Sequence, residues 1–190
     1  MKKELKAATM VFPTPTLIVG TYNEDGTANA MNVAWGGVCA SEPPCVQISI
    51  RAERKTRENI DKRKAFTLHI SGKSLMDKSD YIGIVSGHSE DKIGKLGLTV
   101  SPGRKVDAPV IEDYPLALEC EVRDICEVGS HIMIIGEVKA VLAEDEILDD
   151  KGKIDVRKLA PLAFDPAGGN YIVCERIAGK AFSAGLKYKK

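Results

Sequence analysis

The sequence predicts a mainly β protein, an antiparallel barrel with helical insertions. Apolar segments with strand character outnumber helical ones, and residues 116–143 contain two long segments that read as one hairpin. The predicted helices are inserted between strands and do not alternate with them strictly, which argues against a doubly wound parallel sheet. No repeat, linker or low-complexity stretch divides the 190 residues, so we expect one domain over 1–190.

The composition excludes several classes of protein. Lys plus Arg and Asp plus Glu each number 27, and the formal net charge is +0. A neutral chain lacks the basic surface of a nucleic-acid-binding protein. A hydrophobic content of 44% argues against disorder, and no apolar run approaches the ~18–20 residues of a membrane span. The N-terminus shows no apolar stretch typical of a secretory signal.

The first half of the chain reads as strands joined by marked turns. Residues 17–22 form a short apolar strand, and the turn that follows places Gly26 where a positive φ is favourable. A long strand over 27–41 is interrupted by the pair Gly36-Gly37, and Pro43-Pro44 then turns the chain. The next strand, 45–51, alternates with period two. Its alternation places four side chains on one face: Cys45, Gln47, Ser49 and Arg51.

A helix over 56–64 leads into a strand over 65–71, which has Phe66, Leu68 and Ile70 on one face and His69 on the other in a structural role. A helical excursion covers about 72–97. The pattern Ser74-x-x-Asp77 is typical of a capping box and predicts a helix to about Val85. A further short helix over 89–96 ends at Gly97.

The last third begins with a hairpin of strands over 116–127 and 131–143, with Gly129 in the connection. Residues 144–155 hold six carboxylates and two lysines, which indicates a solvated loop or a surface that orients a partner. A last strand over 171–177 precedes a basic tail, 186–190.

The five cysteines show no zinc spacing, and we expect reduced core thiols in a cytoplasmic protein, with a redox-active disulfide as the alternative. Three dispersed histidines likewise predict no metal site.

The segment 28–37 carries the only tryptophan, two asparagines and two adjacent glycines. Asparagine amides both donate and accept hydrogen bonds, which suits the edge of a heterocycle, and strand glycines allow a close approach of the backbone. The segment therefore indicates a ligand site or, alternatively, a bulged core strand with a buried Trp35.

The segment 51–64 is basic, with seven cations and three anions. Its cations open a helix near Thr56, and free backbone N–H groups at a helix start attract phosphate. Lys55, Thr56 and Arg51 would complete such a site; the alternative is a solvated basic helix. Neither a Walker motif nor G-x-G-x-x-G occurs.

Two further segments have polar groups that could meet a ligand. The junction between two helices at Ser86-Gly87 offers small polar contacts, or is a simple turn. His131 follows Gly129-Ser130 at the start of a strand and is a weak candidate for proton donation, or a solvated residue. No G-x-S-x-G motif and no nucleophile with an adjacent base can be identified.

Taken together, these segments resemble the flavin reductase-like family, whose fold is an FMN-binding split barrel. The matching pieces cover about residues 10–143 and are most similar to the flavoredoxin branch. They include Pro13-Thr14-Pro15, the 19–22 strand with Asp25-Gly26, the 29–37 segment, Pro43-Pro44, Ser49-Ile50-Arg51, Lys55-Thr56 with Asn59-Ile60, residues 81–87, Asp91-Lys92, Ala108-Pro109, residues 115–120, and His131 with Gly136-Glu137-Val138.

The resemblance implies a homodimer with one FMN per subunit near the interface. It implies that the segment from Asn29 to Trp35 holds the flavin ring, and that Ser49, Ile50 and Arg51 lie beside the ribityl chain and phosphate. The implied phosphate contacts are Lys55, Thr56 and Asn59, and Ser86, Gly87 and Lys92 complete the site. The whole implied set is Asn29, Met31, Asn32, Val33, Ala34, Trp35, Ser49, Ile50, Arg51, Lys55, Thr56, Asn59, Ser86, Gly87 and Lys92.

One departure bears on the activity. Many family members that use NAD(P)H carry Gly-Asp-His at the hairpin, where this chain has Gly129-Ser130-His131. The missing carboxylate favours an electron carrier of the flavoredoxin type, which takes electrons from an iron–sulfur or other protein donor. An NAD(P)H-dependent flavin reductase and a non-redox binding barrel are the alternatives.

Overall fold

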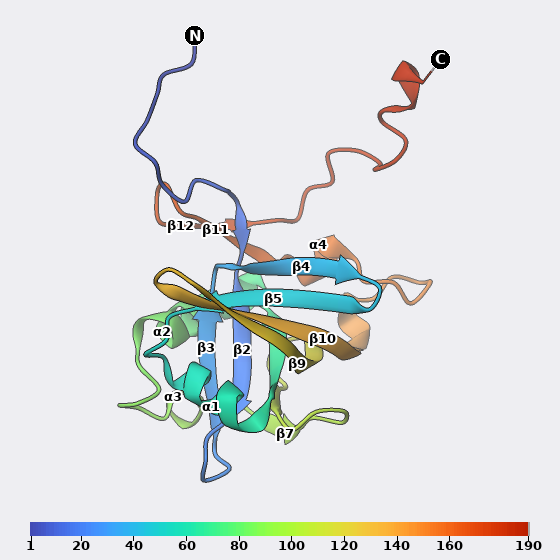
Figure 1. The fold of residues 1–190 in the computed structure, drawn as a ribbon. Coiled ribbons are helices and arrows are strands. Elements are labelled where there is room, and N and C mark those ends of the chain that lie inside the picture. The colour runs from blue at the N-terminus through green and yellow to red at the C-terminus, as the bar shows by residue number, and fades with distance from the viewer. Residues whose placement is uncertain (190) are drawn as a thin grey trace.

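The computed structural model describes residues 1–189, and its main feature is a seven-stranded antiparallel sheet (Figure 1). The strand order is β3-β2-β6-β9-β10-β5-β4. The bounds are β2 Leu17–Tyr22, β3 Ala28–Val33, β4 Gly36–Ser41, β5 Pro44–Ile50, β6 Ala65–Ile70, β9 Leu116–Val128 and β10 His131–Ala143. The predicted class, a mainly β antiparallel split barrel with helical insertions, is confirmed.

The two edge strands explain both the barrel and its split. β3 and β4 stand at opposite ends of the strand order, yet only Ala34 and Trp35 separate them in the chain. The sheet must therefore curl round until its edges nearly meet, and they do not pair with each other along their length. The backbone N–H of Ser49 donates to the carbonyl of Trp35 (2.7 Å) where the chain crosses between them. We call this opening the seam.

The barrel interior is filled by one apolar cluster. It combines residues from six strands and α1 (Lys55–Arg63), with Phe66, Ile48 and Ile134 among its fully buried members. Gly136 on β10 admits the ring of Phe66, because a Cβ built there would lie 2.6 Å from the Phe66 Cζ. Such close packing supplies most of the apolar burial that stabilises the fold.

A second cluster lies on the outer face of β2 and β3, beneath the helical excursion. Ile18 and Ala30 of these strands pack against Ile82 and Ile93 of the two helices. The elements are η1 Lys73–Leu75, α2 Met76–Ile84 and α3 Lys92–Lys95, followed by the β7 (Val100–Pro102) and β8 (Pro109–Ile111) hairpin. This layer places the end of α2 and the start of α3 beside β3.

A small three-stranded sheet closes one end of the molecule. Its strands are β1 (Thr14–Pro15), β11 (Leu162–Asp165) and β12 (Asn170–Val173), with β11 in the middle. The short helices η2 (Asp145–Ile147) and α4 (Val156–Leu159) precede β11 in the chain. The chain on either side of this sheet extends away from the body as two long arms, and η3 (Leu186–Tyr188) lies in the C-terminal arm (Figure 1). No helix within residues 1–189 is long and apolar enough to cross a membrane.

The hairpin β9–β10, the strand β6 and the turn at Gly26 (φ +84°) agree with the sequence prediction, whereas the strand break does not. The break falls at Ala34–Trp35, and both glycines of the pair lie inside β4. A side chain at position 36 would clash, because a Cβ there would lie 2.7 Å from Leu17 Cδ1. Gly36 is therefore required by packing and does not interrupt the strand.

The predicted capping box is wrong. Ser74 lies in a 3₁₀ turn, and α2 begins at Met76 without a side-chain cap. The neighbouring Gly72 and Lys73 are fixed by backbone hydrogen bonds to the segment around Ala160 and Pro161, so tertiary contacts set the entry into the helix. The helix predicted over 89–96 is also shorter, because Asp91 caps α3 by accepting from the Gly94 N–H (3.0 Å).

Two other expectations are corrected. The last strand ends at Val173 rather than residue 177, and β1, β7, β8 and β11 were not predicted. All five cysteines are free, but only Cys45 and Cys120 are buried, and Cys39 is exposed on the edge strand β4, at the register shift in its pairing with β5. Of the predicted tail 186–190, Lys190 lies outside the described residues.

Candidate functional site

A groove follows the seam from the start of α1 to Trp35. One half is lined by β3, the first turn of α1 and the junction after α2; its lining is Asn29, Met31, Asn32, Arg54, Lys55, Thr56, Ile82, Gly83, Val85, Ser86, Gly87 and Lys92. The other half shares Met31, Asn32 and Arg54 and continues along Val33, Ala34, Trp35, Ser49, Ile50, Arg51 and His131. Because the halves share three residues, we treat them as one site and call it the seam groove.

The groove collects fourteen of the fifteen contacts that the family resemblance implied, along with His131. Trp35 is half-buried and lines the groove, so the alternative of a buried core tryptophan is wrong. Asn59 is the exception. Its side chain is buried and donates to Thr21 Oγ1 (3.0 Å) and Asn23 Oδ1 (2.9 Å), which ties α1 to the β2–β3 turn.

Asn29 joins the three elements that form the first half. Its Nδ2 donates to Thr56 Oγ1 on α1 (3.1 Å), and the side chain is 5% exposed. Its Oδ1 faces the junction after α2, where a Cβ on Gly87 would lie only 2.2 Å from it. A side chain at Gly87 would thus displace Asn29, so this glycine is needed for the close approach.

Asn32, three residues further along β3, makes a similar link between the strand and α2. Its Nδ2 donates to the Ser79 carbonyl of α2 (2.8 Å), and a Cβ on Gly83 would meet the Asn32 Cβ at 3.2 Å. The two asparagines therefore fix the distance between β3 and the helical layer. Sequence reasoning identified both asparagines and Gly87, but it missed Gly83.

The start of α1 presents donors to the groove. Arg54 occupies the N-cap position with extended backbone angles, and no side chain caps the helix. The Arg57 N–H donates to the Arg54 carbonyl (2.8 Å), which leaves the N–H groups of Lys55 and Thr56 at the helix start, where unpaired N–H groups carry partial positive charge. Lys55 pairs with Glu58 (3.0 Å), whereas Arg54 forms no ion pair within residues 1–189. The sequence reading missed Arg54, although the basic run around it was noted.

Lys92 is the strongest electrostatic feature of the groove. The side chain comes from the first residue of α3 and is only 4% exposed. Its Nζ donates to the carbonyls of Ile82 (3.0 Å) and Val85 (3.1 Å), and no carboxylate within the described chain pairs with it. Burial, and secondly the charge of Arg54, lower the pKa of Lys92 to about 8, with Glu90 opposing.

A buried ammonium with only carbonyl partners is costly unless an anion approaches it. The groove therefore fits a ligand with an anionic group at the α1 end, where Lys92, Lys55 and free N–H groups converge. Its far end, between half-buried Trp35, half-buried Met31 and the β3 backbone, offers apolar and amide surface that suits a planar ring. These residues thus match the chemistry of a phosphorylated heterocyclic cofactor.

At the far end, His131 is half-buried and its Nδ1 lies 2.9 Å from Ser130 Oγ. No carboxylate contacts its ring among the described residues. Another histidine, His69, is fully buried away from the groove: its Nε2 accepts from the Ile111 N–H (2.9 Å) and Nδ1 lies 3.1 Å from the Ile18 carbonyl. The predicted structural role of His69 is confirmed.

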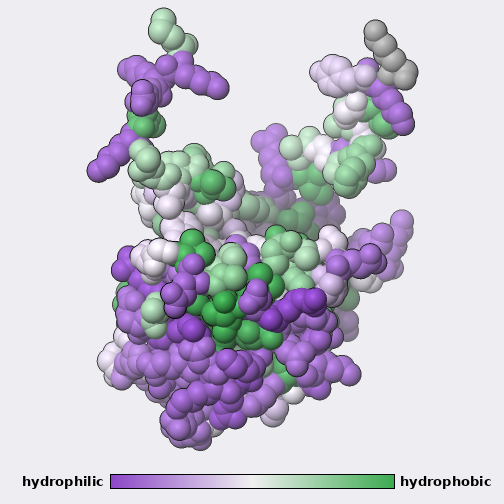
Figure 2. Space-filling view, viewed as in Figure 1, coloured by the Kyte–Doolittle hydropathy of each residue, from purple (hydrophilic) through white to green (hydrophobic). Residues whose placement is uncertain are grey.

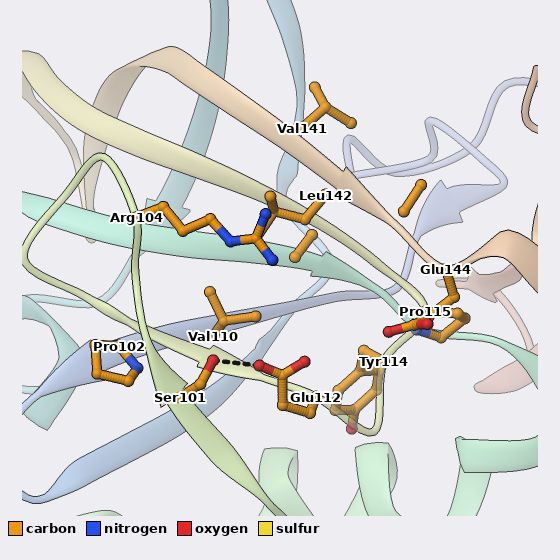
Figure 3. Close-up of a pocket in the computed structure, with 12 residues that line it drawn as sticks. Ser101, Pro102, Arg104, Val110, Glu112, Tyr114, Pro115, Val141, Leu142 and Glu144 are labelled. Carbon is orange, nitrogen blue, oxygen red and sulfur yellow. Dashed lines mark hydrogen bonds between the residues drawn. The ribbon is translucent and has the colours of Figure 1, made fainter. Parts of the chain in front are cut away.

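A separate hollow of about 270 Å³ lies between the β7–β8 hairpin and the β9–β10 ends (Figure 3). Its charged lining residues, Arg104, Glu112 and Glu144, are all exposed, and Ser101 donates its hydroxyl to Glu112. It holds none of the predicted site residues and lacks a buried, unpaired charge, so the seam groove is the better candidate.

Comparisons with known proteins show which family and fold the chain is similar to. A family model described as "Flavin reductase like domain" matches residues 9–166. The chain is 40% identical to a solved structure, flavoredoxin of Desulfovibrio vulgaris (Miyazaki F), with a TM-score of 0.93 over 97% of this chain and 100% of that one. Flavoredoxin from Methanosarcina acetivorans is 29% identical, with a TM-score of 0.89 over 98% and 100%.

Among curated relatives, an uncharacterized protein of Aeropyrum pernix is 31% identical over 130 residues. That match covers 68% of this chain, and the chain spans 49% of the length of that relative.

Proposed function

The chain belongs to the flavin reductase-like family, and on that basis we propose that it binds FMN and carries electrons between a protein donor of the iron–sulfur type and an acceptor. The observation that carries the proposal is the buried Lys92, whose ammonium has carbonyl partners only, at one end of a groove with amide and apolar walls. The 40% identity to a flavoredoxin across 97% of the chain supports the carrier role.

The phosphate of FMN would lie at the start of α1. Free backbone N–H groups there, the Thr56 hydroxyl, and the Lys55 and Lys92 ammonium groups would donate to its oxygens. Arg51 and Arg54 add positive charge at the rim. When bound, the flavin supplies the redox chemistry, and the protein supplies binding and orientation.

The flavin ring would lie along the segment from Asn32 to Trp35. The backbone of this segment leaves the β3 ladder at Ala34, and the Trp35 carbonyl accepts from the Ser49 N–H (2.7 Å), so the backbone groups of Ala34 are the ones left to meet the polar edge of the ring. Asn32, held by the Ser79 carbonyl, keeps a fixed orientation, and the half-buried Trp35 covers apolar ring surface. A preorganised wall of this kind lowers the entropy lost on binding.

We extend the proposal to a homodimer. Figure 2 shows apolar surface across the middle of the face that β4, β5, β9 and β10 form in this view. The outward-facing positions Met133 and Ile135 on β10, with their β9 neighbours Cys126 and Val128, are only partly covered. We call these four residues the apolar face. His131 lies in the same row, so a second copy seated there would also cover the open end of the seam groove.

The alternative of an NAD(P)H-dependent flavin reductase has one observation in its favour. His131 lines the groove, where it could contact a nicotinamide. Among residues 1–189 its side-chain partner is Ser130 alone, which lacks the carboxylate that would orient the ring and stabilise its charged form. The carrier role therefore has the stronger support.

A reduction assay separates the two functions. Purified protein is reconstituted with FMN, freed of excess flavin, and mixed anaerobically with either NADH, NADPH or a reduced ferredoxin. We expect the ferredoxin to bleach the visible absorbance rapidly and both nicotinamides to do so slowly. Rapid bleaching by NADH or NADPH, reduced at least tenfold in His131→Ala, would establish the reductase instead. A protein that takes up no FMN would overturn both functions and favour a non-redox barrel.

A further inference from the structure

Charge is divided unevenly between the two arms of this neutral chain and its body. Residues 1–13 and 174–190 together hold eight of the 27 cations and two of the 27 anions, which leaves 19 cations and 25 anions in residues 14–173. The arms are therefore basic and the body is acidic. Because opposite charges favour association, the arms of one copy are complementary to the body of another.

The C-terminal arm, residues 174–189 of the described chain, leaves the body directly after β12 (Figure 1). The Cys174 N–H donates to the Pro161 carbonyl (2.8 Å), and the backbone hydrogen bonds beyond this residue all lie within the arm. None of its cations pairs with a carboxylate of residues 1–189. Hydrogen bonds to the body thus hold the arm only at its base.

Large apolar side chains on this arm face solvent. Phe182 is 100% exposed, Tyr188 80% and Leu186 57%, and the cations Lys187 and Lys189 stand among them. Several exposed apolar residues in one short segment mark an interaction site, because burial of their surface is favourable. The arm therefore fits a surface that is both acidic and partly apolar.

The body presents such a surface on residues 144–155, which we call the acidic loop. Ile154 in this loop exposes 43% of its apolar surface. Four of its carboxylates are exposed and form no ion pair within the described residues, namely those of Glu144, Asp145, Glu146 and Asp150. The acidic loop and the basic tail are sequence features that the seam groove does not use.

The acidic loop is also preorganised. Ile147 is buried in a cluster with Leu116 and Leu159. Asp149 accepts from the backbone N–H groups of Lys151 and Lys153, both at 2.9 Å. A loop that is held in this way loses little conformational entropy when a partner binds, which favours it as a docking surface.

We propose that the C-terminal arm of one copy docks on the acidic loop of a second copy. Lys187 and Lys189 pair with the free carboxylates, and the apolar side chains of the arm cover Ile154. The 16 residues of the arm span up to roughly 50 Å when extended, against a radius of gyration of about 16 Å for a chain of this length, so the arm can reach a neighbouring copy. In a symmetric dimer the contact is made twice. The inference rests on the proposed homodimer and not on the cofactor.

Reversing the charges tests the pairing, with the dimer dissociation constant of the FMN-loaded protein measured by analytical ultracentrifugation. Lys187→Glu/Lys189→Glu and Glu144→Lys/Glu146→Lys should each weaken the dimer by about tenfold or more, because attraction becomes repulsion in both copies of the contact. Combining the two pairs exchanges the charges and should restore the dissociation constant to within about threefold of wild type.

The matched control is Lys73→Glu/Lys105→Glu, which makes the same change in charge on the body. Both lysines are exposed and form no ion pair within residues 1–189. This variant should dimerise as wild type does.

Photocrosslinking identifies the surface that the arm touches. Phe182→p-benzoylphenylalanine replaces a side chain that is 100% exposed, so it leaves the packing of the body intact. On illumination we expect a product of twice the chain mass, with the crosslink in the tryptic peptides that span residues 140–157 of the other copy.

Several results would overturn the proposal. These are unchanged dissociation constants in both charge-reversal variants, or a charge-exchanged protein as weakened as either parent variant. A crosslink within one chain would assign the arm to its own body, and a crosslink outside residues 140–157 would contradict the acidic loop as its site. A wild type that stays monomeric at micromolar concentration would contradict the arm contact and the homodimer together. Wild-type protein that takes up no FMN would contradict the proposed cofactor alone, because the same measurements on the flavin-free protein still test the arm.

Discussion

At the scale of single residues, Lys92 determines how the seam groove responds to pH. Its pKa of about 8 in the free protein, caused first by burial and then by Arg54, means that the ammonium loses its proton between neutral and alkaline pH. FMN needs the protonated form, so the dissociation constant should increase by up to about tenfold per pH unit above pH 8. A fluorescence titration of FMN between pH 7 and 10 measures this.

The control for this prediction is Lys92→Met, which keeps the apolar stem and removes the charge. Its FMN affinity should be lower and independent of pH in the same range. If the variant shows the same alkaline loss as wild type, another group is responsible.

His69 makes a separate contribution to stability. Burial lowers its pKa from 6.5 to about 4, because the ring is enclosed between Ile18 and Ile111 as a neutral group. Between these values the unfolded chain binds a proton and the folded chain does not. The free energy of unfolding should therefore fall by ~3 kcal/mol as the pH is lowered from 6.5 to 4.

Urea unfolding at several pH values checks the His69 prediction. The variant His69→Gln retains a donor and an acceptor and should lose most of this acid dependence, whereas His88→Gln, on an exposed segment, controls for removing a histidine elsewhere. An acid slope in His69→Gln equal to that of wild type would contradict the assignment.

At the scale of elements, the contact between Phe66 on β6 and Gly136 on β10 limits the size of the side chain that β10 can accommodate at this position. A Cβ at Gly136 would lie 2.6 Å from Phe66 Cζ and 3.0 Å from Cys120 Cβ. Gly136→Ala should thus destabilise the fold by ~1–3 kcal/mol through overpacking. Gly37→Ala on β4, where nothing lies within 4 Å of the added carbon, is the matched control. Equal midpoints in urea for both variants would show that the barrel relaxes around the extra methyl group.

Most elements of the barrel could be predicted from the sequence, because period-two alternation and turn glycines act locally. The β9–β10 hairpin and β6 are examples. Elements whose formation depends on distant segments were missed. β11 carries little pattern of its own and exists because it pairs with both β1 and β12, and the start of α2 is set by contacts of Gly72 with Pro161 rather than by Ser74.

The residues of the candidate site likewise fall into those that the sequence could predict and those that only tertiary packing places. Asn29, Asn32 and Thr56 stand in segments whose composition already indicated a ligand, and the family resemblance added the rest. The burial of Lys92, the placement of Arg54 at the groove and the diversion of Asn59 to the β2–β3 turn follow from packing of the helical layer on β3. No local pattern encodes that packing.

At the scale of the whole molecule, the proposed dimer connects the apolar face to the seam groove. Ile135 faces outward between Gln47 and Asp124, so a charge there does not enter the barrel. Ile135→Glu should halve the mass measured by light scattering and weaken FMN, because the open end of the groove loses its cover. Val141→Glu, on the exposed far end of β10, should keep the mass of wild type. A wild-type protein that is already monomeric at micromolar concentration would contradict the dimer.

The central claim is that the seam groove holds FMN by its phosphate at Lys92 and the start of α1. Calorimetric titration of wild type and Lys92→Met with FMN and with riboflavin, which lacks the phosphate, tests it most directly. The account predicts that wild type binds FMN far more tightly than riboflavin, and that Lys92→Met loses about 10- to 100-fold for FMN while riboflavin is unaffected. Equal losses for both ligands, or none for either, would contradict it.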